Sequence, residues 1–107
     1  MIYKFKSKAA GDVIMVAAGG DQVLRILGRE PAAQGILEVC DMPAAMSALE
    51  AAVAQDEQAR REAEAEAAAE GRTLPPREAV TLRQRAWPLL EMIRRSHGAD
   101  ADIVWGA

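Results

Sequence analysis

TLRQRAWPLLEMIRR, residues 81–95, is the most informative stretch of this 107-residue chain, because it combines a helix start, an apolar face and an internal proline. Thr81 and Gln84 match the capping box, in which each side chain bonds a backbone N–H at the start of a helix. One arc of the helix is apolar and is predicted to be buried: Leu82, Ala86, Leu89, Leu90 and Ile93. Pro88 lies roughly opposite this arc, where water can replace the hydrogen bond that proline cannot donate. The helix is therefore predicted to bend toward the core at Pro88.

A second helix is predicted upstream, beginning near Met42 with Asp41 as its N-cap. Its first half carries an apolar stripe at helical spacing: Met42, Met46, Leu49 and Val53. From there to Glu70 the chain consists almost entirely of Ala, Glu, Gln and Arg, which favour helix but form no core. We expect this helix to leave the core, with a projecting or flexible Ala/Glu-rich segment at about residues 54–73. Residues 74–76 (LPP) are predicted to connect it to the helix at 81–95.

The N-terminal part of the chain predicts a β-hairpin followed by a short helix. Ile2–Lys6 alternates apolar and basic residues, as in a half-buried strand. Residues 12–16 (DVIMV) are apolar on both faces, as in a more central strand. Gly19 and Gly20 are expected to break this pattern. The helix is then predicted over Asp21–Leu27, capped by Asp21 and ended by Gly28.

Two more short strands complete the expected fold, at Ile36–Val39 and Ile103–Trp105. The order β-β-α-β-α-α-β predicts a small single α+β domain spanning residues 1–107, with a mainly antiparallel sheet packed by helices on one face. Only four residues are aromatic, so the core is expected to be aliphatic. The order of the strands across the sheet does not follow from the pattern.

Composition and charge exclude several classes of protein. No apolar run approaches the ~20 residues of a membrane-spanning helix, and the N-terminus alternates in a way that no signal peptide does. The single cysteine, Cys40, fits a reducing compartment, so a cytoplasmic location is predicted. The net charge is −3 and unevenly distributed. Residues 41–70 carry two arginines and eight acidic residues, whereas residues 71–97 carry six arginines and two acidic residues.

The strongest candidate for a ligand or partner surface is one flank of the helix at 81–95, formed by Arg83, Trp87, Leu90 and Arg94. Arginines beside an indole suit an acidic peptide, a nucleotide or RNA, through charge and cation–π contacts. The other interpretation is that the acidic helix covers this flank and that the arginines pair with Glu50, Asp56 or Glu57. Neighbouring helices joined by a short loop usually pack antiparallel, which favours this intramolecular pairing. The acidic net charge disfavours a nucleic-acid partner but does not exclude one.

The remaining candidates favour structural roles. Cys40 is predicted to be buried and unreactive, and His97 to cap the C-terminal end of its helix, with Gly98 in the left-handed conformation. The Gly19-Gly20-Asp21 segment is predicted to be a plain turn, because it lacks the spacing of a phosphate-binding loop. No spacing typical of a metal site, a cofactor site or a catalytic set is present. The sequence therefore disfavours an enzyme but leaves the question open.

Four segments together resemble a known family: MIYKFKSKAAGDVIM (residues 1–15), LGREP (27–31), MPAAMSALEAAVAQ (42–55) and TLRQRAWPLLEMIRR (81–95). They resemble an uncharacterised proteobacterial family, domain-of-unknown-function family 1840. The resemblance covers nearly the whole chain in order, apart from the Ala/Glu-rich stretch and the extreme C-terminus. It implies a small soluble bacterial protein, and it implies no established activity, cofactor or catalytic residue.

These observations lead to two hypotheses of function. The first is a non-catalytic protein-interaction module, binding a protein partner or a second copy through an edge strand or through the two oppositely charged helices. The alternative is a binder of a small anionic ligand or RNA at the Arg83/Trp87/Arg94 flank.

Overall fold

The computed structural model of the chain describes residues 2–73 and 81–106, which form three helices and a four-stranded antiparallel sheet. The elements in chain order are β1 (Ile2–Ser7), β2 (Ala10–Val16), α1 (Ala17–Ile26), β3 (Gly35–Leu37), α2 (Met42–Ala69), α3 (Leu82–Gly98) and β4 (Ile103–Trp105). A 3₁₀ turn at Val39–Asp41 precedes α2. The α+β class and the order β-β-α-β-α-α-β are those that the sequence predicts. The predicted connection at residues 74–76 lies outside the described residues.

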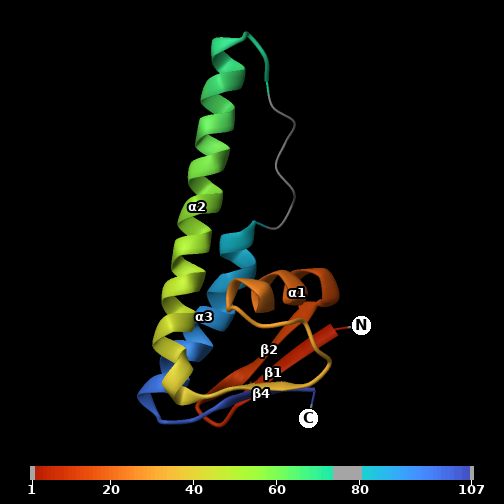
Figure 1. Ribbon diagram of the computed structural model, residues 1–107, viewed down its shortest axis with the longest axis vertical. Coiled ribbons are helices and arrows are strands. Elements are labelled where there is room, and N and C mark those ends of the chain that lie inside the picture. The colour runs from red at the N-terminus through yellow and green to blue at the C-terminus, as the bar shows by residue number, and fades with distance from the viewer. Residues whose placement is uncertain (1, 74–80, 107) are drawn as a thin grey trace.

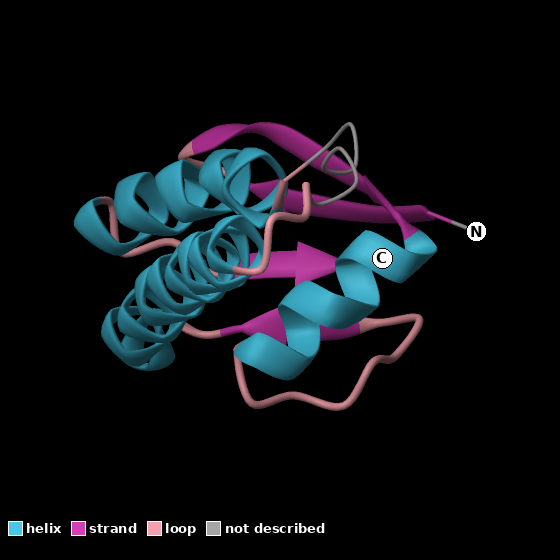
Figure 2. Cartoon of the chain, turned by 90° about the horizontal axis from the view of Figure 1, so that it is seen from above, coloured by secondary structure: helices cyan, strands magenta, loops and turns pink. Residues whose placement is uncertain are grey.

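The sheet has the order β2-β1-β4-β3, so β1 and β4 are central and β2 and β3 form the edges. All neighbouring strands are antiparallel, and Phe5 of β1 lies opposite Val13 on one side and Trp105 on the other. Viewed from above, all three helices lie on the same face of the sheet (Figure 2). Within residues 2–73 and 81–106, no helix lies over the other face.

The core lies between the helices and the inner face of the sheet, and it is more aromatic than expected. Tyr3 and Phe5 stack with ring centroids 6.1 Å apart, and Phe5 meets Trp105 at 5.6 Å. All three are almost fully buried. The expectation of a purely aliphatic core is therefore wrong, because three of the four aromatic residues fall on inward-facing strand positions.

Helix α1 begins earlier than predicted, and its glycines do not break it. Gly19 and Gly20 lie inside the helix and are buried. A Cβ on Gly20 would come 2.0 Å from Cδ2 of Tyr3, so glycine is needed for close packing against the strand. Asp21 does not cap the helix; it accepts a hydrogen bond from the Tyr3 hydroxyl. Gly28 does end the helix, with φ of 81°, as expected.

Helices α2 and α3 form an antiparallel pair that dominates the shape of the molecule. The 28 residues of α2 span about 42 Å, and the C-terminal half of the helix extends past the sheet (Figure 1). Helix α3 packs beside the first half of α2. Its capping box between Thr81 and Gln84 forms as predicted, and the predicted arc of buried residues is confirmed.

Two predictions about element ends are wrong. Helix α3 includes Gly98, and the left-handed residue after it is Asp100, with φ of 57°. The left-handed residue thus comes two positions later than expected, and the Ala101 N–H bonds the Ser96 carbonyl across this turn. Strand β3 ends at Leu37, so Cys40 falls in the exposed 3₁₀ turn instead of the core.

Candidate functional site

The predicted flank of α3 faces α2 and borders a small hollow between the two helices. Arg83, Trp87 and Leu90 line this hollow, whose volume is about 110 Å³. Leu90 is buried, whereas the Trp87 side chain is 49% exposed at the rim. Arg94 is not among the lining residues. The structure therefore brings three of the four predicted site residues to one hollow.

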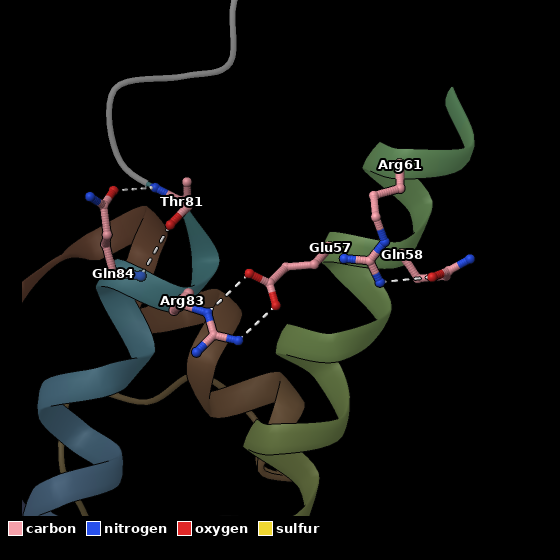
Figure 3. A network of polar contacts seen from close by, with 6 residues as sticks. All are labelled: Glu57, Gln58, Arg61, Thr81, Arg83 and Gln84. Atoms are coloured by element: carbon pink, nitrogen blue, oxygen red, sulfur yellow. Dashed lines mark hydrogen bonds and ion pairs between the residues drawn. The ribbon is translucent and has the colours of Figure 1, made fainter. Parts of the chain in front are cut away.

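Arg83 is held by α2 through a two-point ion pair with Glu57 (Figure 3). Its Nε donates to Oε2 at 3.0 Å, and its Nη2 donates to Oε1 at 2.7 Å. This hydrogen bonding, reinforced by the negative charge of Glu57, raises the pKa of the Arg83 guanidinium above its ordinary value. The fork geometry is the one that arginine uses to bind a carboxylate ligand. The carboxylate here comes from the same chain.

Arg94 is also placed among carboxylates of its own chain. It lies 3.8 Å from a carboxylate oxygen of Glu50 on α2, and it forms an ion pair with Glu91 one turn earlier on α3. Two of the pairings expected from an acidic helix covering an arginine-bearing flank are thus present, to Glu50 and to Glu57. The positive charge of the flank is largely balanced before any ligand arrives.

The hollow itself offers apolar contact. Its walls are formed mainly by aliphatic side chains from both helices: Leu49, Val53, Ala54, Ala86 and Leu90. A volume of 110 Å³ suits one apolar side chain of a partner, with Trp87 as an exposed rim. No residue that lines it is a nucleophile or an ordinary general base other than Glu50.

A second surface, on the sheet face opposite the helices, was missed by the sequence reasoning. Four large apolar side chains are exposed there: Ile2 (58%), Ile14 (59%), Val16 (67%) and Ile36 (40%). The apolar run in DVIMV predicts a more central strand. This assignment is wrong, because β2 is an edge strand of a sheet with helices on one face only. The sequence did contain a signal for this surface, because residues 13–16 are apolar on both sides of the strand. One side faces the core, and the other side, with Ile14 and Val16, is exposed.

The other candidates lie apart from both surfaces. Cys40 is exposed in the turn before α2, and His97 is exposed in the last turn of α3. Among residues 2–73 and 81–106, no three His, Cys, Asp or Glu side chains are grouped so as to hold a metal ion. Within the same ranges, no helix combines the length and apolar character needed to cross a membrane.

Comparison with known proteins identifies the family and nothing more specific. The model of the family described as "Domain of unknown function (DUF1840)" matches residues 1–105, nearly the whole chain. No curated protein and no solved structure matches the sequence or the fold. This chain belongs to the DUF1840 family.

Proposed function

We propose that this protein is a non-catalytic protein-interaction module whose partner covers the open face of the sheet. The proposal rests on the exposure of three apolar side chains of β1 and β2 on the sheet face opposite the helices: Ile2, Ile14 and Val16. Ile2 pairs directly with Val16 in the sheet register, so these side chains are neighbours. A cluster of large apolar side chains on an uncovered sheet face is typical of a surface that a protein partner buries.

The edge of the sheet supports the same proposal. Strand β2 has seven residues, and one of its sides has no neighbouring strand among the residues that the structure describes. Proteins that stay monomeric protect such edges with lysines, prolines or bulges. Residues 13–16 (VIMV) carry no charge and no proline. Full burial of an aliphatic side chain contributes about 1.5–3 kcal/mol, so covering this edge and face would stabilise a complex.

The charged residues on the same face are of both signs. Lys4 lies opposite Ile14 in the register, and Lys6 lies opposite Val104, so the lysines separate two apolar areas. Asp12 forms an ion pair with Lys4 at 3.6 Å. Asp12, Asp100 and Asp102 line a hollow of this face together with Lys6 and Lys8. A partner that places charged side chains of both signs around an apolar area would match this pattern.

Native mass spectrometry of protein isolated gently from its own host at low salt tests the proposal. We expect the wild-type chain to carry a second polypeptide, and the Ile14→Thr/Val16→Thr double variant to lose most of it. Threonine retains the β-branched shape that a strand favours, and circular dichroism serves to confirm an unchanged fold. A bare monomer for both proteins would contradict the proposal. A nucleotide-sized added mass would instead favour the Arg83/Trp87/Arg94 flank as an anion site.

A further inference from the structure

A groove of about 480 Å³ runs beside the open edge of β2, between that strand and α3. Residues 12–16 form one side, and Gln84, Arg85 and Pro88 of α3 form the other. Gly19, near the start of α1, also borders the groove. An open strand edge beside a groove is the arrangement into which an extended peptide adds as a further strand.

Arg85 gives this groove a chemical preference. Its Nε is buried and has no hydrogen-bond partner within the described part of the chain. The Arg85 side chain lies against Gly19, where a Cβ would come 3.3 Å from Cδ of the arginine. By contrast, Arg83 and Arg94 on the same helix are paired with carboxylates. A buried guanidinium nitrogen without a hydrogen-bond acceptor is energetically unfavourable. A carboxylate is the acceptor that forms the strongest hydrogen bond with it.

Pro88 leaves a helical carbonyl in the same wall without its usual hydrogen-bond donor. Proline has no N–H, so it cannot donate the helical hydrogen bond to the carbonyl of Gln84, four residues earlier. Both residues line the groove, and Pro88 is exposed. The rigid ring and the available carbonyl suit contact with a peptide side chain that donates a hydrogen bond.

We infer that β2 and α3 together bind an extended acidic segment of another protein, which adds to β2 as a fifth strand and places a carboxylate against Arg85. This inference deepens the proposed function and rests on it. The segment continues the sheet through backbone hydrogen bonds, and its outward side chains lie beside Ile14 and Val16. Its inward side chains enter the groove, where Arg85 selects glutamate or aspartate.

A second copy of this chain fits the groove less well. The inward side chains of β2 are Val13 and Met15, whereas Asp12 points to the open face and pairs with Lys4. Two β2 strands paired about a two-fold axis keep their inward faces on the same side of the joined sheet. Neither strand would then offer a carboxylate to Arg85. The charge requirement therefore selects a different, acidic polypeptide.

An array of extended peptides of about nine residues tests this inference, since β2 itself has seven residues. Each sequence is made as a pair that differs only in a central Glu or Gln. We expect the Glu member of binding pairs to bind at least about tenfold more tightly, as expected for a hydrogen bond to a charged group. Arg85→Gln should abolish this difference. Arg94→Gln, the matched control on the α2 side of the same helix, should leave it intact.

Amide hydrogen exchange on the wild-type protein gives a second readout that does not depend on a variant folding. Bound peptide should slow exchange in residues 10–16. The inference would be overturned if the Glu and Gln members of each pair bound equally well. It would also be overturned if Arg94→Gln, and not Arg85→Gln, removed the difference, or if bound peptide slowed exchange outside residues 10–16. Protection of β2 without peptide, rising with protein concentration and persisting in Arg85→Gln, would overturn it in favour of a second copy. If the array fails while mass spectra still show a partner that needs Ile14 and Val16, the proposed function stands without this inference.

Discussion

At Gly20, packing against a strand opposes the usual preference of a helix for alanine. Replacing a helical glycine with alanine ordinarily stabilises a protein by up to about 1 kcal/mol. Here the added Cβ would meet the Tyr3 ring at 2.0 Å, and this ring is fixed by its stacking on Phe5 and its hydrogen bond to Asp21. We predict that Gly20→Ala destabilises the fold by about 1–3 kcal/mol in urea unfolding.

Gly98 provides the matched control for that substitution. It lies at the C-terminal end of α3, and a Cβ there would have no neighbouring atom within 4 Å. Gly98→Ala should therefore leave stability unchanged or raise it by up to about 1 kcal/mol. Equal effects of the two substitutions would show that the contact between α1 and Tyr3 is looser than described.

The hydroxyl of Tyr3, the only tyrosine in the chain, should titrate above its ordinary range. Its hydrogen bond to Asp21, together with burial and the negative charge of that carboxylate, raises the pKa of the phenol above 10.0. A raised folded-state pKa means that the stabilisation is complete below about pH 10 and is lost as pH rises through the folded-state pKa. The ultraviolet absorbance of the phenolate measures this titration directly.

Asp21→Asn should lower the pKa of Tyr3 toward 10.0, because it removes the charge that disfavours the phenolate. Asp12→Asn is the control, since Asp12 pairs with Lys4 on the open face of the sheet. An unchanged Tyr3 pKa in Asp21→Asn would contradict the assigned hydrogen bond.

At the scale of elements, Pro88 reduces the stability of α3. It occupies the interior of a 17-residue helix and is exposed, so an alanine there would restore a hydrogen bond to the Gln84 carbonyl. We predict that Pro88→Ala raises the free energy of unfolding by about 1–3 kcal/mol, measured in urea. Arg95→Ala, another exposed position on α3, should change it by less than about 0.5 kcal/mol. A loss of stability in Pro88→Ala would contradict this prediction.

The elements that the sequence predicts well are those whose signal is local. The capping box at Thr81, the apolar arc of α3 and the alternation of β1 all depend on residues within a few positions of each other. The misassigned elements depend on distant contacts. The sequence predicts a turn at Gly19 and Gly20, whereas both lie inside α1, where Gly20 packs against Tyr3. It predicts a buried Cys40, whereas β3 ends at Leu37 and leaves Cys40 exposed.

In the candidate site, too, the features with a signal in the sequence are predicted, and those that depend on the strand order are not. Charge patterning offers, as one of two interpretations, that the arginines of this flank pair with Glu50, Asp56 or Glu57. The structure pairs Arg83 with Glu57 and Arg94 with Glu50. The open sheet face and the groove at Arg85 required the strand order. No local pattern specifies that β2 lies at an edge.

For the molecule as a whole, the helices cover one face of the sheet and leave the other face and the β2 edge uncovered. The α2–α3 flank carries arginines that the chain itself neutralises, whereas the open face carries apolar side chains that nothing in the described chain covers. This contrast supports the proposal that the interaction surface lies on the sheet, while the flank of α3 that faces α2 is paired with α2 through ion pairs.

Site-specific photo-crosslinking in the native host tests this placement most directly. A photoreactive phenylalanine analogue replaces Ile14 on the open face, Trp87 at the rim of the hollow, or Gln58 on the outer side of α2 in three separate proteins. The account predicts a discrete crosslinked protein product from position 14 and none from position 58. A product from position 87 alone, or no product from position 14, would contradict it.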